Sequence, residues 1–195
     1  MSKRFCIPKG LLSEARRFLR KNPHTVHDVI VFGSLMRGKE SPSDIDILIL
    51  FQFKEDRELA YNLRKSMEKN YPKVEVIPKT FESLMSSTFQ ARETVLWEGY
   101  SCRTGQPFAE GFGFFPQVLF KFHFKKISAS RRIQFFYSLK GRGGSPGMIN
   151  RLGLSKFSDG VLACPVRYVE EVRQYLNSWD AQIEEVPVLF PRRLW

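Results

Sequence analysis

Two apolar runs near the N-terminus constrain the fold more than any other feature of the sequence. Residues 28–32 read Asp-Val-Ile-Val-Phe, and residues 44–51 read Asp-Ile-Asp-Ile-Leu-Ile-Leu-Phe. Both are rich in the side chains that favour strands. The second run is almost wholly apolar beyond its first three residues, which is typical of a strand covered on both faces. We therefore expect a sheet with flanking helices.

The segments around these runs predict an N-terminal half of α/β character. Apolar side chains recur at helical spacing over residues 10–21 and 54–70, and proline-containing pairs follow each segment. Residues 73–77 (Lys-Val-Glu-Val-Ile) predict a third strand, and residues 81–98 predict one further helix. We expect this domain to span residues 1–104.

The second half of the chain predicts a smaller α+β module. Residues 105–116 are rich in Gly, Pro and Phe without clear periodicity, so we expect a linker there and a module over residues 117–195. The overall class is α+β, with a mixed sheet in the first domain. The expected elements of the module are strands over 117–127, 132–139, 160–166 and 183–190, and helices over 148–154 and 168–179.

The module is also markedly basic, within a chain of net charge +11. No acidic residue lies between Glu110 and Asp159, whereas nine lysines and arginines do. Such a stretch is often only a solvated face, but its aromatic neighbours also suit nucleic acid, as bases stack on aromatic rings. The candidate nucleic-acid-binding residues are Lys125, Lys126, Arg131, Arg132, Lys140 and Arg142.

Two features of the module leave alternatives open. Residues 140–145 (Lys-Gly-Arg-Gly-Gly-Ser) fit either a phosphate cradle or a hairpin tip. The aromatic residues between 120 and 137 fit either a stacking platform for bases or an ordinary core. No apolar run approaches the ~18 residues of a membrane span, and residues 1–9 do not resemble a signal peptide. We expect a cytoplasmic protein without a membrane partner.

The residues that carry chemistry are concentrated in positions 33–46. Gly33 follows a buried strand and permits close approach of a ligand to the backbone. Ser34 stands at a predicted helix start, where free N–H groups favour phosphate. Asp44 and Asp46 are two apart on a predicted strand, so both carboxylates point to the same face.

This combination predicts a magnesium-dependent phosphate chemistry. Mg²⁺ prefers a few carboxylates together with substrate phosphates and water, and two such ions activate an attacking hydroxyl and stabilise a leaving pyrophosphate. A third acid is needed, and Glu75 is the best candidate because it lies mid-strand among apolar residues. One helix separates its strand from that of Asp44 and Asp46, so the two strands are possible sheet neighbours.

The segment Val-Phe-Gly-Ser-Leu-Met-Arg-Gly followed by Ser-Asp-Ile-Asp-Ile resembles the signature of the DNA polymerase β-like nucleotidyltransferase superfamily, and is most similar to its minimal members. The resemblance covers about residues 25–100. It implies that Gly33 and Ser34 hold the triphosphate and that Asp44 and Asp46 bind two Mg²⁺ ions, with Mn²⁺ as an alternative. Arg37 matches an arginine of minimal members and is either a phosphate contact or one half of a structural ion pair.

One position departs from the family, because the third carboxylate is usually Asp where this chain has Glu75. The acids of the following segment, Glu82, Glu93 and Glu98, are given no catalytic role. The expected reaction is transfer of NMP from an NTP, with ATP as the expected donor, to an acceptor hydroxyl. An RNA end fits the basic module. A hydroxyl of a partner protein is also a suitable acceptor, because the resemblance includes family members that modify partner proteins in toxin–antitoxin pairs. The remaining alternative is a nucleic-acid-binding module with a vestigial transferase site.

Overall fold

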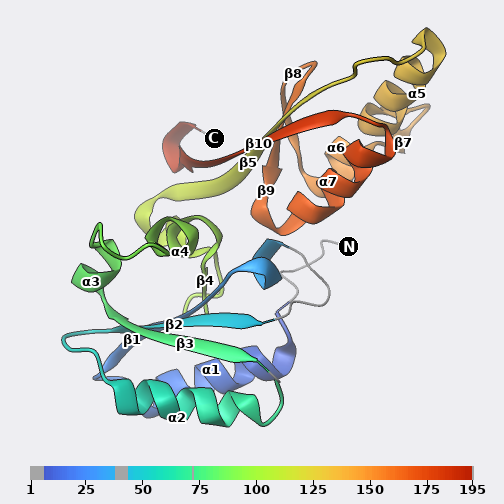
Figure 1. The fold of residues 1–195 in the computed structure, drawn as a ribbon. Coiled ribbons are helices and arrows are strands. Elements are labelled where there is room, and N and C mark those ends of the chain that lie inside the picture. Colours follow the sequence, from blue (N-terminus) through green and yellow to red (C-terminus); the bar gives the residue numbers. More distant parts are fainter. Residues whose placement is uncertain (1–6, 38–43, 72, 195) are drawn as a thin grey trace.

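The computed structural model describes residues 7–37, 44–71 and 73–194, which form two four-stranded sheets that follow one another along the chain (Figure 1). The first sheet has the strand order β3-β2-β1-β4 and mixes parallel with antiparallel pairs, and the second has the order β10-β5-β9-β8. The predicted α+β class with a mixed sheet is confirmed. Within the described ranges, no helix has the length and apolar character needed to cross a bilayer.

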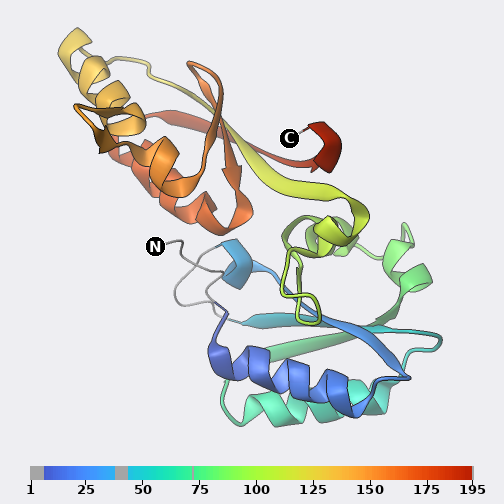
Figure 2. The same ribbon diagram turned by 180° about the vertical axis from the view of Figure 1, so that it is seen from behind.

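The first sheet and its helices use residues up to about position 112. Its elements are α1 (Lys9–Lys21), β1 (Val26–Phe32), the 3₁₀ helix η1 (Ser34–Arg37), β2 (Ile45–Phe51), α2 (Arg57–Glu68), β3 (Val74–Thr80), α3 (Phe81–Met85), α4 (Arg92–Glu98), β4 (Tyr100–Ser101) and the 3₁₀ helix η2 (Phe108–Phe112). The helices α1 and α2 lie against one face of the sheet, and α3 and α4 lie on the other (Figures 1 and 2).

Helices on both faces explain the apolar sequence of β2. Ile47 and Ile49 join the core formed with α1 and α2, whereas Leu48 and Leu50 join the core that includes Val95 of α4. All four β2 side chains are fully or almost fully buried. Successive strand residues point to opposite faces. Because helices cover both faces of β2, these side chains are buried on each side and are therefore apolar.

The single helix expected over residues 81–98 is wrong, because the structure has two short helices there. After α3, Ser86 adopts a non-helical backbone, and its hydroxyl lies 2.8 Å from that of Thr88. The Thr88 backbone N–H also donates to the Ser86 hydroxyl. Serine and threonine side chains compete in this way with helical hydrogen bonding, which explains the break.

The second sheet is built from residues 114–191. Its elements are β5 (Phe114–His123), α5 (Ala129–Lys140), the hairpin β6 (Gly141–Arg142) and β7 (Ser145–Pro146), α6 (Met148–Leu152), β8 (Ser155–Ser158), β9 (Val161–Pro165), the 3₁₀ helix η3 (Val166–Tyr168), α7 (Val169–Ser178), β10 (Gln182–Pro191) and the 3₁₀ helix η4 (Arg192–Leu194). Apart from the inserted hairpin and α6, these elements follow a β-α-β-β-α-β order.

The core of this second unit lies between its sheet and the helices α5, α6 and α7. Val118, Phe120 and Phe122 alternate along β5 and are buried there, so the two rings among them belong to the core. Linking the two units, the indole N–H of Trp97 in α4 donates to the Gln117 carbonyl in β5 (2.8 Å). The division into residues 1–104, 105–116 and 117–195 stays a prediction, although Phe108 from the expected linker packs into the first unit.

The strand predicted over residues 132–139 is wrong, because these residues belong to the helix α5. Ser128 caps the helix by accepting the backbone N–H of Arg131. The apolar residues at 133, 135, 137 and 139 alternate like those of a strand, but only Phe135 and Leu139 are buried, and they are four residues apart. Periods of two and of 3.6 both fit such a short run.

Candidate nucleotidyl-transfer site

The Gly33-Ser34 turn lies directly against Asp46. Gly33 has φ +84°, a left-handed conformation that side chains with a Cβ rarely adopt, and a Cβ added there would lie 2.1 Å from Asp46 Oδ2. The backbone N–H of Met36 donates to the Gly33 carbonyl (3.0 Å) and closes the turn into η1. Glycine is therefore required both by the backbone conformation and by the closeness of the carboxylate.

Ser34 presents a buried polar atom without a partner. Its hydroxyl oxygen is buried and makes no hydrogen bond with any described residue. Leaving such a group unsatisfied costs about 1–3 kcal/mol, so an orphaned hydroxyl in a native structure needs an explanation. A bound ligand with acceptor oxygens supplies one, and phosphate suits a hydroxyl at the first residue of η1.

The three predicted carboxylates lie on adjacent strands. Asp44 immediately precedes β2, Asp46 lies within it, and β2 pairs in parallel with β3 so that Asp46 is directly opposite Glu75. Burial raises the pKa of Asp46, and the charges of Asp44 and Glu75 raise it further, whereas Arg37 opposes the shift. These charges therefore act on one another, and a cation placed among them relieves their repulsion.

No group of three or more acidic, histidine or cysteine side chains in the described part of the chain converges closely enough to form a metal site by itself. Asp44 and Glu75 are exposed, and Asp46 is half-buried. Carboxylates of this type are ligands for a hard cation such as Mg²⁺, which takes only one or two of them and completes its shell with phosphate and water. The donor set thus fits a divalent ion that binds together with a nucleotide.

Arg37 forms an ion pair with a residue to which sequence reasoning gave no role. Its Nη1 donates to both carboxylate oxygens of Glu98, at 2.9 and 2.7 Å, and the Glu98 side chain is fully buried. The backbone N–H of Gly33 donates to the same carboxylate. Burial raises the pKa of Glu98 to about 6, although Arg37 counteracts part of that shift.

A signal for Glu98 was present in the sequence. An acid in the last turn of a helix faces the negative end of the helix dipole, which disfavours it. Glu98 is the last residue of α4, directly before Gly99. An acid retained at such a place needs a compensating partner, and the structure supplies Arg37.

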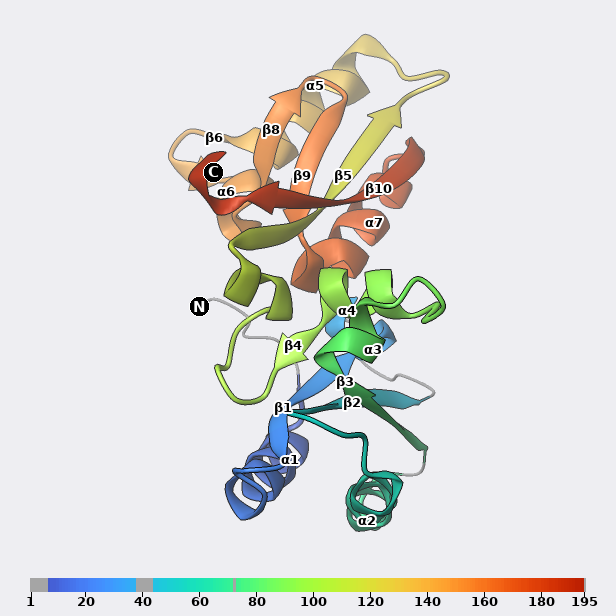
Figure 3. The same cartoon turned by 90° about the vertical axis from the view of Figure 1, so that its left-hand side faces the viewer.

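The second unit contacts the turn from the other side. The short helix η3 packs against η1, and Figure 1 shows η1 beneath the junction of β9 and α7. Val166 and Tyr168 of η3 are buried, as are Leu35 and Met36 of η1. The turn of residues 33–37 therefore lies where the two units meet, with α4 at the same junction (Figure 3).

The six basic residues predicted to bind nucleic acid do not join the carboxylates. They lie in the loop after β5, in α5 and in the following hairpin, at the end of the molecule remote from the first sheet (Figures 1 and 3). Arg131 pairs with Asp180 at 3.1 Å. Lys140 lies over the Phe136 ring at 5.4 Å and Arg142 over the Tyr137 ring at 4.5 Å, whereas Lys125 and Lys126 are exposed.

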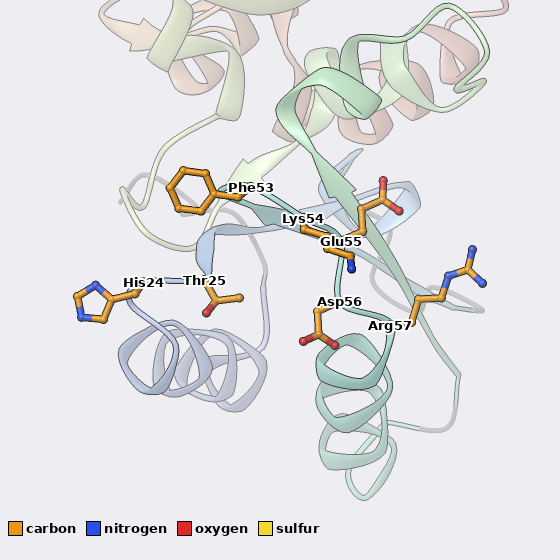
Figure 4. A pocket seen from close by; sticks show the side chains of 7 residues that line it. All are labelled: His24, Thr25, Phe53, Lys54, Glu55, Asp56 and Arg57. Atoms are coloured by element: carbon orange, nitrogen blue, oxygen red, sulfur yellow. The ribbon is translucent and has the colours of Figure 1, made fainter.

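A surface hollow in the first unit lies elsewhere. It follows the carboxyl end of β2, whereas Asp44 and Asp46 are at the start of that strand, and Figure 4 shows its side chains spread around an open depression. Asp56 is already engaged there as the cap of α2, accepting the Leu59 N–H at 2.9 Å. Its lining is His24, Thr25, Phe53, Lys54, Glu55, Asp56 and Arg57. This hollow is not part of the carboxylate site.

Comparison with known proteins agrees with the geometry. Residues 12–95 match the family model of the nucleotidyltransferase domain, and this range includes the turn and all three carboxylates. Residues 12–95 are therefore similar to the nucleotidyltransferase domain, which is the resemblance that the sequence motif indicated.

Two solved structures are similar to part of the chain. A mutant of the toxin–antitoxin MntA-HpeT is 19% identical, with 47% of this chain and 70% of that chain covered and a TM-score of 0.36. A toxin–antitoxin with AMP-PNP is 22% identical, with 47% and 71% covered and a TM-score of 0.37. No curated protein matches the chain.

Proposed function

We propose that this protein transfers a nucleoside monophosphate from a nucleoside triphosphate, with ATP as the expected donor, to an acceptor hydroxyl, and that the acceptor is an RNA end. The observation that carries the proposal is the orphaned Ser34 hydroxyl in a turn built against Asp46. A candidate phosphate-binding group and a candidate metal-binding group are thereby joined through one glycine, within residues that match the nucleotidyltransferase domain.

The residues of the turn would bind the triphosphate. The Ser34 hydroxyl and the free backbone N–H groups at the start of η1 would donate to the β- and γ-phosphates. Arg37 would add positive charge beside them, although two of its hydrogen bonds are already directed to Glu98. Gly33 would let the phosphates approach the backbone because no side chain intervenes.

Asp44, Asp46 and Glu75 would hold two Mg²⁺ ions, or Mn²⁺ in their place. When bound, these ions would supply the positive charge that activates the acceptor hydroxyl and stabilises the leaving pyrophosphate. The acceptor oxygen would bond to the α-phosphorus while the bond from that phosphorus to the pyrophosphate oxygen breaks. Glu75, exposed on its strand, would accept the proton that the hydroxyl loses.

The RNA acceptor is supported by the surface around α5. Its side chains Ile133 and Tyr137 are 52% and 43% exposed, one helical turn apart, and Arg142 lies over the Tyr137 ring. No acid occurs between Glu110 and Asp159 in the sequence, and the acid that the structure brings to α5 is Asp180, which pairs with Arg131. An exposed aromatic ring such as that of Tyr137, placed among cations, is a feature by which proteins bind single strands without strict sequence preference.

The test is transfer of label from each α-labelled NTP with Mg²⁺, to RNA and, separately, to cell lysate. Wild-type protein is expected to label RNA, and Asp46→Ala to lose transfer at least about 1,000-fold while keeping its melting temperature, since removing one of several mutually repelling carboxylates relieves strain. Near-normal transfer by Asp46→Ala contradicts the site assignment.

The same experiment separates the alternatives. A labelled protein band without labelled RNA would move the acceptor to a partner protein. Salt-sensitive RNA binding without transfer to any acceptor would identify a binding module with a vestigial site.

A further inference from the structure

We propose that Glu98 is the positioning residue of the phosphate turn, which ties both ends of residues 33–37 to the end of α4 and so keeps Ser34 available to the triphosphate. This inference rests on the proposed function, because it assigns a role within the same site. Glu98 lies in α4, outside the motif of residues 33–46 and outside the strands that carry Asp46 and Glu75.

The contacts of Glu98 define that role. One carboxylate accepts the Gly33 backbone N–H, at the first residue of the turn, and two bonds of 2.9 and 2.7 Å from Arg37, at the last residue of η1. A single buried group thus spans the turn from end to end. Ser34 lies between these two anchors, and its hydroxyl is left without a partner.

Glu98 itself is held rigidly. A Cβ on the adjoining Gly99 would lie 2.2 Å from the Val95 carbonyl oxygen and 3.0 Å from Ile30 Cγ2, so α4 ends in close contact with β1. On the other side of Glu98, Trp97 donates to the Gln117 carbonyl at 2.8 Å. The carboxylate therefore has little freedom to follow the turn, and the turn must conform to it.

The electrostatics agree with a positioning role. A buried carboxylate is costly unless it is paired and hydrogen-bonded, and Arg37 with the Gly33 N–H meets both conditions. The charge of Arg37 also acts on Asp46. Through Arg37 and Gly33, Glu98 is thus connected to the phosphate side and to the carboxylate side of the site.

The experiment compares Glu98→Gln and Arg37→Lys with the matched control Glu93→Gln. Glu93 lies on the same helix, but its side chain is 86% exposed. The measurements are KM for the NTP, kcat, binding of a non-hydrolysable NTP analogue with Mg²⁺, and the melting temperature. Glutamine keeps the shape of the side chain but loses its charge, and lysine keeps the charge of Arg37 on a shorter side chain without the planar guanidinium that places Nη1 between both Glu98 oxygens.

We expect Glu98→Gln and Arg37→Lys each to raise KM and the analogue Kd by about 10- to 100-fold, the range seen when groups that orient ligands are removed. We expect kcat to fall less than KM rises, because the turn holds the β- and γ-phosphates rather than the reacting α-phosphorus. The double variant should be about as impaired as either single variant, since both disrupt one interaction. Glu93→Gln should match wild type.

Wild-type KM in folded Glu98→Gln overturns the proposal, and so does a loss confined to melting temperature. If Glu98→Gln does not fold, Arg37→Lys decides, because it retains a cation beside the buried carboxylate. These outcomes differ from failure of the proposed function, in which wild-type protein itself neither binds the analogue nor transfers label.

Discussion

The phosphate turn and the surface of α5 use charge in opposite ways. At the turn, the Glu98 side chain is fully buried, and Arg37 engages it with two bonds. On α5, Arg131 and its partner Asp180 are 50% and 77% exposed, and one bond of 3.1 Å joins them. Breaking a fully buried pair costs about 3–5 kcal/mol and an exposed pair contributes about 0–1 kcal/mol, so the Arg37–Glu98 pair, in which Arg37 is 37% exposed, lies between these values.

Under the proposed function, this difference suits the two ligands that the protein would bind. A triphosphate must be held at one place relative to the carboxylates, because reacting atoms misplaced by about 1 Å can lose 100-fold in rate. A nucleic-acid strand presents charge along its whole length, so exposed lysines and arginines can bind it without fixed geometry. Changes at the turn should therefore alter catalysis steeply, and changes on α5 should alter affinity in proportion to the charge removed.

After Asp46→Ala, the largest expected effect comes from Gly33→Ala. The new Cβ would lie 2.1 Å from Asp46 Oδ2 and would displace that carboxylate. Alanine would also have to adopt the left-handed backbone conformation of Gly33, which is unfavourable for a residue with a Cβ. We expect transfer to fall by about 100-fold or more and the free energy of unfolding by about 1–3 kcal/mol. Steady-state kinetics and chemical denaturation measure the two losses.

The matched control for that change is Gly111→Ala, because a Cβ at Gly111 meets no atom within 4 Å. It should leave both transfer and stability near wild-type values. Comparable activity in the two alanine variants would show that the turn tolerates a side chain, and the fixed-geometry account of the site would then be wrong.

A smaller and graded effect is expected on α5. The change is neutralisation of Lys125, Lys126, Arg131 and Arg132. RNA affinity should fall, and the slope of log K against log salt should shrink by about 0.7 for each phosphate that the protein no longer neutralises, hence by up to about 3. Titrations at several salt concentrations measure this slope.

The control removes the same amount of charge from exposed positions of α1, of α2 and of the residue that follows α2. The control set is Arg20, Lys21, Lys65 and Lys69. If both sets reduce affinity and slope equally, binding responds to net charge alone, and the α5 surface has no particular role.

The sequence predicted the first unit well because its signals are local. Gly33, Ser34, Asp44 and Asp46 all lie within one short segment. The continuous apolar sequence of β2 predicted that both of its faces are covered. The pairing of Asp46 with Glu75 was also accessible, since strands joined by one helix are commonly parallel neighbours. Residues 39–43, whose Ser and Pro side chains predict a loop, lie outside the described residues.

What sequence reasoning missed depends on tertiary contacts. Arg37 and Glu98 are 61 residues apart, and only the packing of α4 over β1 brings them together. The helix α5 was predicted as a strand because its apolar residues alternate. Packing of Phe135 into the core favours the helix, whose period of 3.6 residues fits the same run. Tertiary packing overrides local pattern where a short run fits both periods.

The last prediction concerns the pH dependence that the buried carboxylate of Glu98 gives to stability. Burial raises the pKa of Glu98 from its ordinary 4.5 to about 6, so the Glu98 carboxylate binds a proton more tightly in the folded protein than in the unfolded chain. Its contribution to stability is therefore complete below pH 4.5 and is lost as the pH rises through 6, by about 2 kcal/mol. Glu98→Gln lacks this proton, whereas the other acids are common to both proteins. Urea denaturation from pH 4 to pH 7 should show the free energy of unfolding of wild type falling relative to the variant. A constant difference would mean that Glu98 is charged throughout, and that Arg37 and the Gly33 N–H compensate its burial fully.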